Sequence, residues 1–153
     1  MNGLARKIAD VDFISVIQSH DVIVLSETWL SQNSHVNLNI LGYESEHLYG
    51  NKSINVKKGR YSGGLSIYYK TNLRDKIHIV EKKQCGIIWI QFCKSLFYFE
   101  TDIYLCCAYI RPRDSKLLDI DDTDMFEQIE SDIEKYKALG KVMVNGDLNS
   151  RTS

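Results

Sequence analysis

Continuous runs of apolar residues predict a set of strands along this chain. In the strongest runs apolar side chains follow one another without alternation, which is typical of strands covered on both faces of a sheet. One run stops before Pro112, because proline has no backbone N–H to donate to a neighbouring strand. The strong runs are 21–25, 65–69, 103–110 and 142–144, and weaker strand patterns occupy 77–80, 86–92 and 96–100.

An apolar stripe at helical spacing predicts a first, short helix. Phe13, Val16 and Ile17 stand at positions i, i+3 and i+4, so they share one helix face. Asp12 precedes them and is a suitable N-cap, since its carboxylate can accept hydrogen bonds from the free N–H groups of the first turn. We expect this helix to end at His20.

A longer helix is predicted over 123–139, opened by Asp122 or Thr123. Its apolar side chains recur along one face while Glu and Lys occupy the other, which is the pattern of a helix packed against a sheet. Gly140 follows as a residue that easily takes the left-handed conformation after a helix C-terminus. The apolar face comprises Phe126, Ile129, Ile133 and Tyr136.

The order of these elements predicts a mixed α/β fold. A helix and a strand are followed by several strands and then by another helix and strand. Residues 31–62 are polar and rich in Asn, so we expect loops there with one short strand. We expect a single domain over 1–153. Because no strand precedes the first helix and no element covers the last strand, we expect that domain to be incomplete at both ends.

Composition and charge narrow the class of protein. Apolar residues make up 44% and charged residues 25% of the 153 residues, which excludes disordered and fibrous classes. The net charge is −1, so any affinity for nucleic acid must come from a local patch. No run is long enough for a transmembrane helix and no signal-peptide pattern opens the chain, so we expect an intracellular protein, nuclear or cytoplasmic, without a membrane partner. We expect the cysteines to be reduced, with Cys106 and Cys107 buried.

Polar residues that could carry chemistry stand where predicted strands end. Glu27 follows the first strand, Tyr109 lies at the end of another, and Asp147 and Asn149 follow the last. If the chain stays extended through Asp147 and Asn149, their side chains point to the same face. Glu27 and Asp147 could then supply carboxylate oxygens to one Mg²⁺, while Asn149 binds a phosphate oxygen or a water. Taken singly, each polar residue has a simpler explanation as a solvated turn residue, and Tyr109 as a core ring.

Five short motifs occur in a fixed order along the chain. They are NGL at 2–4, DVIVLSETWL at 21–30, GGLSIYYK at 63–70, YIRP at 109–112 and VNGDLNSRT at 144–152. Together they strongly resemble the endonuclease/exonuclease/phosphatase superfamily, and within it the endonuclease domain of non-LTR retrotransposon polyproteins. The resemblance covers essentially the whole chain but only the front part of the family domain. It implies a partial four-layer α/β sandwich, in which helices flank two mixed sheets.

The resemblance also implies a role for each candidate residue. Glu27 matches the glutamate that holds the catalytic Mg²⁺, for which Mn²⁺ is an alternative, and Asn2 matches the asparagine that helps to position the metal. Tyr109 matches the tyrosine that contacts the scissile phosphate. Asp147 matches the aspartate that orients or activates the attacking water, and Asn149 the asparagine that steadies the phosphoryl group. The implied reaction is hydrolysis of a phosphodiester in DNA without a small-molecule cofactor.

The sequence departs from the family pattern at several points. Leu148 takes the place of an aromatic residue, and Arg111-Pro112-Arg113 stands where the family has an asparagine or a small residue. The family's closing Ser-Asp-His motif, with its catalytic histidine, has no counterpart in this sequence. None of the four histidines can be assigned to that role. We therefore expect the chain by itself to be inactive or nearly so.

Other interpretations stay open. A non-catalytic nucleic-acid-binding remnant would keep the fold without the chemistry, and an unstable decayed gene fragment would have no function. A phosphoinositide or a small phosphodiester could replace DNA as the substrate. The oligomeric state is open as well. The basic stretch Lys52, Lys57, Lys58 and Arg60 could contact a nucleic-acid backbone, although a solvated loop is the commoner role of so short a run.

Overall fold

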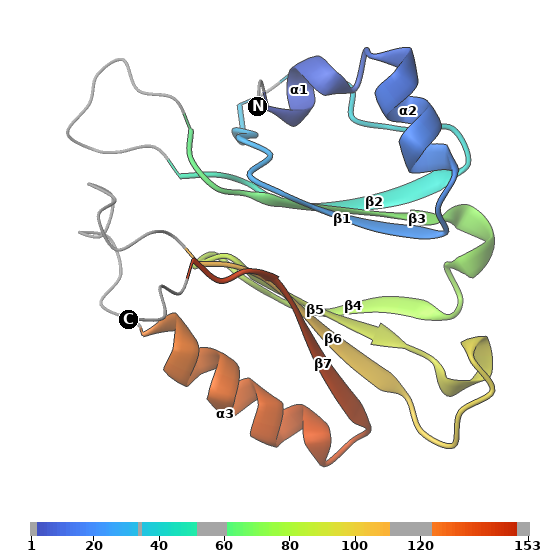
Figure 1. Ribbon diagram of the computed structural model, residues 1–153, viewed down its shortest axis with the longest axis vertical. Coiled ribbons are helices and arrows are strands. Elements are labelled where there is room, and N and C mark those ends of the chain that lie inside the picture. Colours follow the sequence, from blue (N-terminus) through green and yellow to red (C-terminus); the bar gives the residue numbers. More distant parts are fainter. Residues whose placement is uncertain (1–2, 34, 52–60, 111–123, 150–153) are drawn as a thin grey trace. The chain divides into compact units, whose positions relative to one another are not determined.

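A computed structural model describes residues 3–33, 35–51, 61–110 and 124–149 of this chain. The backbone divides into two compact units, Met1–Arg74 and Asp75–Ser153. Each unit combines a β-sheet with helices (Figure 1), which confirms the mixed α/β fold with two sheets. None of the helices within the described ranges is long and apolar enough to cross a membrane.

The first unit is an antiparallel sheet with two helices on one face (Figure 1). Its core forms where side chains of the helices meet the central strand, around the fully buried Ile17 and Tyr68. The helices are α1 (Leu4–Lys7) and α2 (Val11–Gln18), and the strands are β1 (Val22–Ser26), β2 (Tyr43–Leu48) and β3 (Leu65–Lys70), followed by the 3-10 turn η1 (Thr71–Leu73). The strand order is β1-β3-β2, and both pairings are antiparallel within the described residues. We expected a mixed sheet here, and the structure corrects that expectation.

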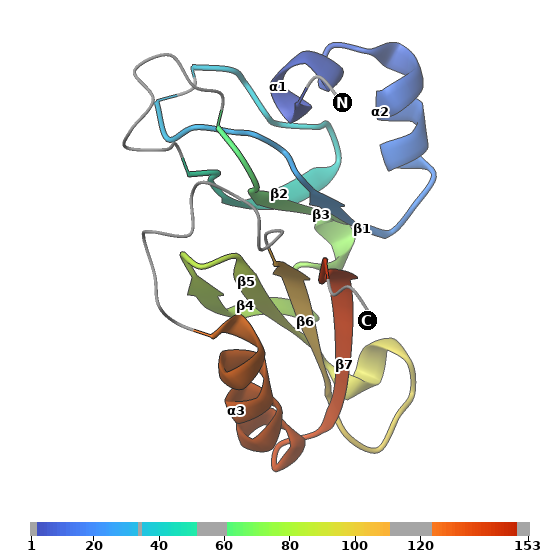
Figure 2. The ribbon, with the colours of Figure 1, turned by 60° about the vertical axis from the view of Figure 1, so that its left-hand side comes forward.

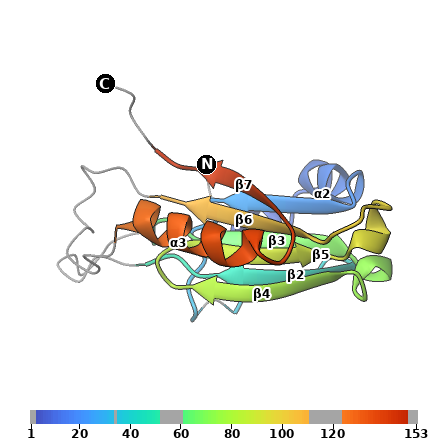
Figure 3. The same cartoon turned by 90° about the horizontal axis from the view of Figure 1, so that it is seen from below.

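The second unit is a four-stranded mixed sheet covered by one helix (Figure 2). Its strands are β4 (Ile77–Lys83), β5 (Ile87–Phe92), β6 (Ile103–Tyr109) and β7 (Lys141–Asp147), its helix is α3 (Met125–Lys137), and η2 (Lys94–Leu96) is a 3-10 turn. The spatial order is β4-β5-β6-β7, with β4 and β7 at opposite edges (Figure 3). Only β6 and β7 are parallel, because α3 lies between them in the chain and returns it to the same end of the sheet.

The core of the second unit lies between α3 and the sheet. Trp89 of β5 and Tyr136 of α3 are buried against each other, with ring centroids 4.4 Å apart. Cys106 and Cys107 of β6 are both buried and in no disulfide, as predicted. Burial raises the pKa of each of these two thiols to about 12.

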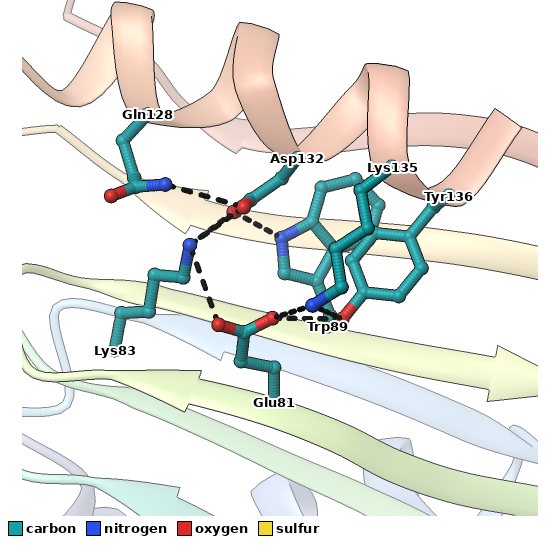
Figure 4. A network of polar contacts seen from close by, with 7 residues as sticks. All are labelled: Glu81, Lys83, Trp89, Gln128, Asp132, Lys135 and Tyr136. Carbon is teal, nitrogen blue, oxygen red and sulfur yellow. Dashed lines mark hydrogen bonds and ion pairs between the residues drawn. The ribbon is translucent and has the colours of Figure 1, made fainter.

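A polar network fastens α3 to the sheet (Figure 4). Asp132 of α3 is buried, and its carboxylate accepts hydrogen bonds from Lys83 Nζ at 2.6 and 2.7 Å and from Trp89 Nε1 at 2.9 Å. Glu81 of β4 accepts from Lys135 Nζ and from the Tyr136 hydroxyl, both at 2.8 Å. Both oxygens of the buried Asp132 carboxylate are therefore engaged, as buried charge requires.

The structure corrects the predicted start of α2. The helix begins at Val11, and its N-cap is Asp10 instead of Asp12. Asp10 has an extended backbone, and its carboxylate accepts from the backbone N–H groups of Asp12 and Phe13. Asp12 lies in the first helical turn, where a negative charge favours the positive end of the helix dipole.

The prediction of a strand over 96–100 is wrong. Residues Lys94–Leu96 form η2, and Tyr98 has a left-handed backbone with φ of 56°. The carboxylate of Asp102 accepts a hydrogen bond from the Lys94 backbone N–H at 2.8 Å, which closes the segment into a tight loop. Strand propensity of the aromatic residues is overridden by this local bond.

The role predicted for Gly140 is also wrong. The C-cap of α3 is Ala138, so Gly140 lies two residues further along and does not terminate the helix. A Cβ atom at Gly140 would overlap the backbone carbonyl oxygen of Asp102. Glycine is thus needed here because two chain segments come close together, and the Lys141 N–H donates to the same Asp102 carbonyl at 2.9 Å.

Candidate functional site

Glu27 lies in a strained turn directly after β1. It and Trp29 have left-handed backbones, with φ of 55° and 52°. Such values are uncommon outside glycine and persist only where the surrounding structure fixes them. Strain of this kind collects at functional sites, so the turn is consistent with the metal-holding role predicted for Glu27.

Backbone hydrogen bonds hold this turn in place. Thr28 donates to the Gly64 carbonyl at 3.3 Å and Trp29 donates to the Gly63 carbonyl at 3.0 Å. The Leu4 N–H, at the start of α1, donates to the Thr28 carbonyl at 2.9 Å. Leu4 of the first motif thus meets the motifs DVIVLSETWL and GGLSIYYK around one turn, although the three lie far apart in the sequence.

Thr28 is a buried residue of this turn that the sequence did not single out. Its Oγ1 atom is buried and has no hydrogen-bond partner in the described part of the chain. Gly64 has φ of 91°, and a Cβ there would lie only 2.6 Å from Thr28 Oγ1. The second glycine of GGLSIYYK is therefore explained by close packing against Thr28. The only sequence signal for Thr28 was its place between Glu27 and Trp29.

The second unit brings Tyr109, Asp147 and Asn149 together. Parallel pairing of β6 with β7 sets Tyr109 directly opposite Asp147. The backbone N–H of Ile110 donates to the Asp147 carbonyl at 2.9 Å, and the Asn149 side-chain amide donates to the Ile110 carbonyl at 2.8 Å. Tyr109 is buried, while Asp147 and Asn149 are exposed.

The expectation that the chain stays extended through Asn149 is wrong. Strand β7 ends at Asp147, and Asn149 has a left-handed backbone with φ of 43°. The Asp147 carboxylate accepts the Asn149 backbone N–H at 3.2 Å, which is the local bond of an Asx turn. The two side chains are therefore brought together by a turn and not by strand alternation.

Three groups of predicted residues fall outside the described part of the chain. They are Asn2, the basic stretch at 52–60 and the Arg111-Pro112-Arg113 segment. Glu27 belongs to the first unit, whereas Tyr109, Asp147 and Asn149 belong to the second. The structure thus gives the local arrangement of each part of the candidate site.

The residues present fit a Mg²⁺ ion held in an open site. Within the described residues no group of three or more His, Cys, Asp or Glu side chains gathers as a metal cage. Mg²⁺ needs no such cage, because it keeps several waters and is usually bound by one or two carboxylates together with substrate phosphates. The half-buried Glu27 carboxylate, on a turn fixed by three backbone bonds, suits that manner of binding.

Known structures show the same fold. The human Nocturnin catalytic domain with bound sulfate is 16% identical with a TM-score of 0.51, and the alignment covers 95% of this chain and 57% of that domain. Humanized D. rerio TDP2 is 15% identical with a TM-score of 0.50, over 99% of this chain and 58% of TDP2. D. rerio TDP2 complexed with a single-strand DNA product is 13% identical with a TM-score of 0.50, over 97% of this chain and 56% of TDP2.

The chain therefore spans a little over half the length of the solved structures that it matches. No curated protein sequence matches it. The model of the Endonuclease/Exonuclease/phosphatase family matches residues 1–152, which is nearly the whole chain. The sequence motifs, the two α/β units and this match agree, and the chain belongs to the Endonuclease/Exonuclease/phosphatase family.

Proposed function

We propose that this chain contributes to a Mg²⁺-dependent phosphodiester hydrolase that nicks DNA, of the non-LTR retrotransposon type. The observation that carries the proposal is the pairing of β6 with β7, which sets Tyr109 beside Asp147 and leaves Asn149 folded back onto Ile110. Membership of the family supports phosphodiester hydrolysis. The TDP2 complex with a single-strand DNA product supports DNA as the substrate class.

Each side chain has a task that its contacts allow. One oxygen of the Asp147 carboxylate accepts the Asn149 N–H, and the other can accept a hydrogen bond from the attacking water. The Asn149 amide is fixed by its bond to the Ile110 carbonyl, and its second N–H can donate to a phosphoryl oxygen. Tyr109, which pairs with Asp147 across the two strands, would contact the phosphate.

Glu27 would hold the Mg²⁺ ion, with Mn²⁺ as an alternative. A bound ion of this kind polarises phosphoryl oxygens as a Lewis acid. We also propose that the 153 residues alone cleave DNA weakly or not at all, because the sequence has no Ser-Asp-His motif. Metal binding is therefore the property of the chain to measure first.

A thermal melt with and without millimolar Mg²⁺ tests the metal site. We expect Mg²⁺ to raise the Tm of the parent chain and of a Glu130→Gln control, since a ligand that binds only the folded state stabilises it. Glu130 is an exposed carboxylate on α3. The Glu27→Gln variant should show no Mg²⁺-dependent rise. An equal rise in this variant would contradict the assignment of Glu27.

A plasmid assay tests the chemistry. We expect slow nicking of supercoiled DNA at most, dependent on Mg²⁺ and abolished by either Glu27→Gln or Asp147→Asn. Salt-dependent plasmid binding that survives both substitutions, without any nicking, would favour the non-catalytic binding remnant. Cleavage of a phosphoinositide in preference to DNA would contradict the proposed substrate.

A further inference from the structure

The loop between β5 and β6 exposes an unusual amount of aromatic surface. Phe97, Tyr98 and Phe99 follow one another in this loop, and their side chains are 47%, 96% and 44% exposed. Large aromatic side chains normally bury most of their surface, because each contributes strongly to a core. Three exposed rings in succession therefore need an explanation.

The two phenylalanine rings contact each other, and one of them contacts the core. The Phe97 ring lies 6.1 Å from the buried Phe92 and 5.8 Å from Phe99, measured between ring centroids. Tyr98 lies between the two phenylalanines in the sequence and is almost fully exposed. Its left-handed φ of 56° is unfavourable for a bulky residue. The fold tolerates this conformation and gains no burial from the ring in return.

Positive charge accompanies the rings. Lys141 Nζ lies 4.5 Å from the centroid of Phe99, and Lys94 opens the loop with an exposed side chain. Glu100 is the exposed carboxylate of the loop. Asp102 is already engaged, because its carboxylate accepts from the Lys94 backbone N–H and from Gln91 Nε2. The loop thus exposes aromatic rings and carries Lys94, and Lys141 of β7 places an ammonium group over one of the rings.

This loop lies at the opposite end of β6 from Tyr109, the candidate residue that β6 carries. It joins the last residue of β5, Phe92, to the first residue of β6, Ile103, whereas Tyr109 is the last residue of β6. A strand of this length spans roughly 20 Å at about 3.3 Å per residue. The loop is therefore separate from the cluster of Tyr109, Asp147 and Asn149.

We propose that the 94–99 loop binds single-stranded nucleic acid by stacking unpaired bases on Tyr98 and its flanking rings, with Lys94 and Lys141 contacting the phosphates. Stacking platforms flanked by basic side chains are the usual way in which proteins bind single strands without reading sequence. Paired bases are stacked inside a duplex, so the rings can reach only unpaired ones.

Fluorescence anisotropy with a labelled oligothymidylate and a duplex of the same length tests this proposal. The measurement is made in EDTA, so it does not depend on a metal at Glu27 and can fail or succeed independently of the proposed hydrolase. We expect the parent chain to bind the single strand more tightly than the duplex. Equal or tighter binding of the duplex would overturn the proposal.

Tyr98→Asn is the informative variant because its effects on binding and on folding should have opposite signs. Asparagine tolerates a left-handed backbone better than tyrosine, so the Tm should stay the same or rise. Loss of one stacking ring should weaken single-strand binding roughly five- to 150-fold. Unchanged affinity in this variant would overturn the proposal.

Two further variants test the charges and the specificity of the effect. Lys94→Gln should lower the slope of log affinity against log salt concentration by about 0.7, the value for one phosphate contact on a single strand. Leu41→Ala removes another side chain that is 93% exposed, in the first unit, and should leave the affinity unchanged. Self-association or binding to lipid vesicles that Tyr98→Asn abolishes, without any oligonucleotide binding, would overturn the proposal in favour of a different occupant.

Discussion

The contact between Asp132 and Lys83 predicts a large loss of stability when the carboxylate is neutralised. Asp132 is 4% exposed, and its carboxylate accepts hydrogen bonds from Lys83, Trp89 and Gln128. In an Asp132→Asn variant the new NH₂ group would face those donors and could not bond to them. The variant therefore both loses a buried ion pair and creates an unsatisfied amide.

The size of the expected loss of stability follows from the burial of the ion pair between Asp132 and Lys83. Removing one partner of a buried ion pair costs about 3–5 kcal/mol, because the other charge stays in place without its counter-ion. Lys83 is not fully buried, since its side chain is 18% exposed and a second carboxylate, Glu81, lies 3.4 Å from its Nζ. Water and Glu81 relieve part of the cost. We expect Asp132→Asn to lower the free energy of unfolding by about 2–3 kcal/mol.

Urea unfolding followed by far-UV circular dichroism and tryptophan fluorescence measures this loss. The exposed Glu130, on the same helix, provides the matched control, and Glu130→Gln should change stability by less than about 0.5 kcal/mol. In a double-mutant cycle with Lys83→Met, the two substitutions should be non-additive by more than about 1 kcal/mol. A loss below about 0.5 kcal/mol for Asp132→Asn, or strict additivity, would refute the reasoning.

The remaining predictions concern pH, burial and thiol chemistry. The hydrogen bond from Lys135 lowers the pKa of Glu81 below its ordinary value of 4.5, so ionised Glu81 contributes fully to folding stability above pH 4.5 and loses this contribution as the pH falls through its lowered pKa. The Tm of a Glu81→Gln variant should therefore fall less steeply with decreasing pH than the Tm of the parent chain. Thr28→Val should keep or raise the Tm, because it removes a buried hydroxyl without a partner among the described residues; a fall of several degrees would show that the hydroxyl is bonded in solution. Cys106 and Cys107 should resist iodoacetamide at pH 8 in the folded chain while the other two cysteines are alkylated, since burial raises the pKa of both; peptide mass spectrometry should find all four labelled only after unfolding in urea.

The strongest apolar runs in the sequence predicted strands correctly. The run at 103–110 became β6, because a strand covered on both faces leaves no polar position to obscure its pattern. The run at 65–69 became β3, although it contains the buried Ser66. Strand β2 has the sequence YESEHL, in which polar residues predominate, and only its place within a polar region could be expected. The left-handed Tyr98 could not be foreseen, since it lies in a loop that the hydrogen bond from the Lys94 N–H to Asp102 closes.

The places of the candidate residues at strand ends were predictable, but their local geometry was not. The ends of β1, β6 and β7 carry Glu27, Tyr109 and Asp147 as expected. The turn that returns Asn149 to Ile110 depends on a long-range hydrogen bond, which no local pattern encodes. The burial of Asp132 could have been inferred from the sequence, because the residue lies three positions after Ile129 and four before Tyr136, on the apolar stripe of α3.

The two edges of the β4–β7 sheet differ in their capacity to accept another strand. At one edge, the pairing of β4 with β5 is interrupted between Ile79 and Glu81, and a bulge of this kind twists an edge away from a flat partner. At the other edge, β7 pairs with β6 in regular register over its whole length and exposes Met143 and Val144. The two edges are therefore not equivalent. We expect a further strand, whether from the same molecule, another chain or an aggregate, to pair with β7 and not with β4.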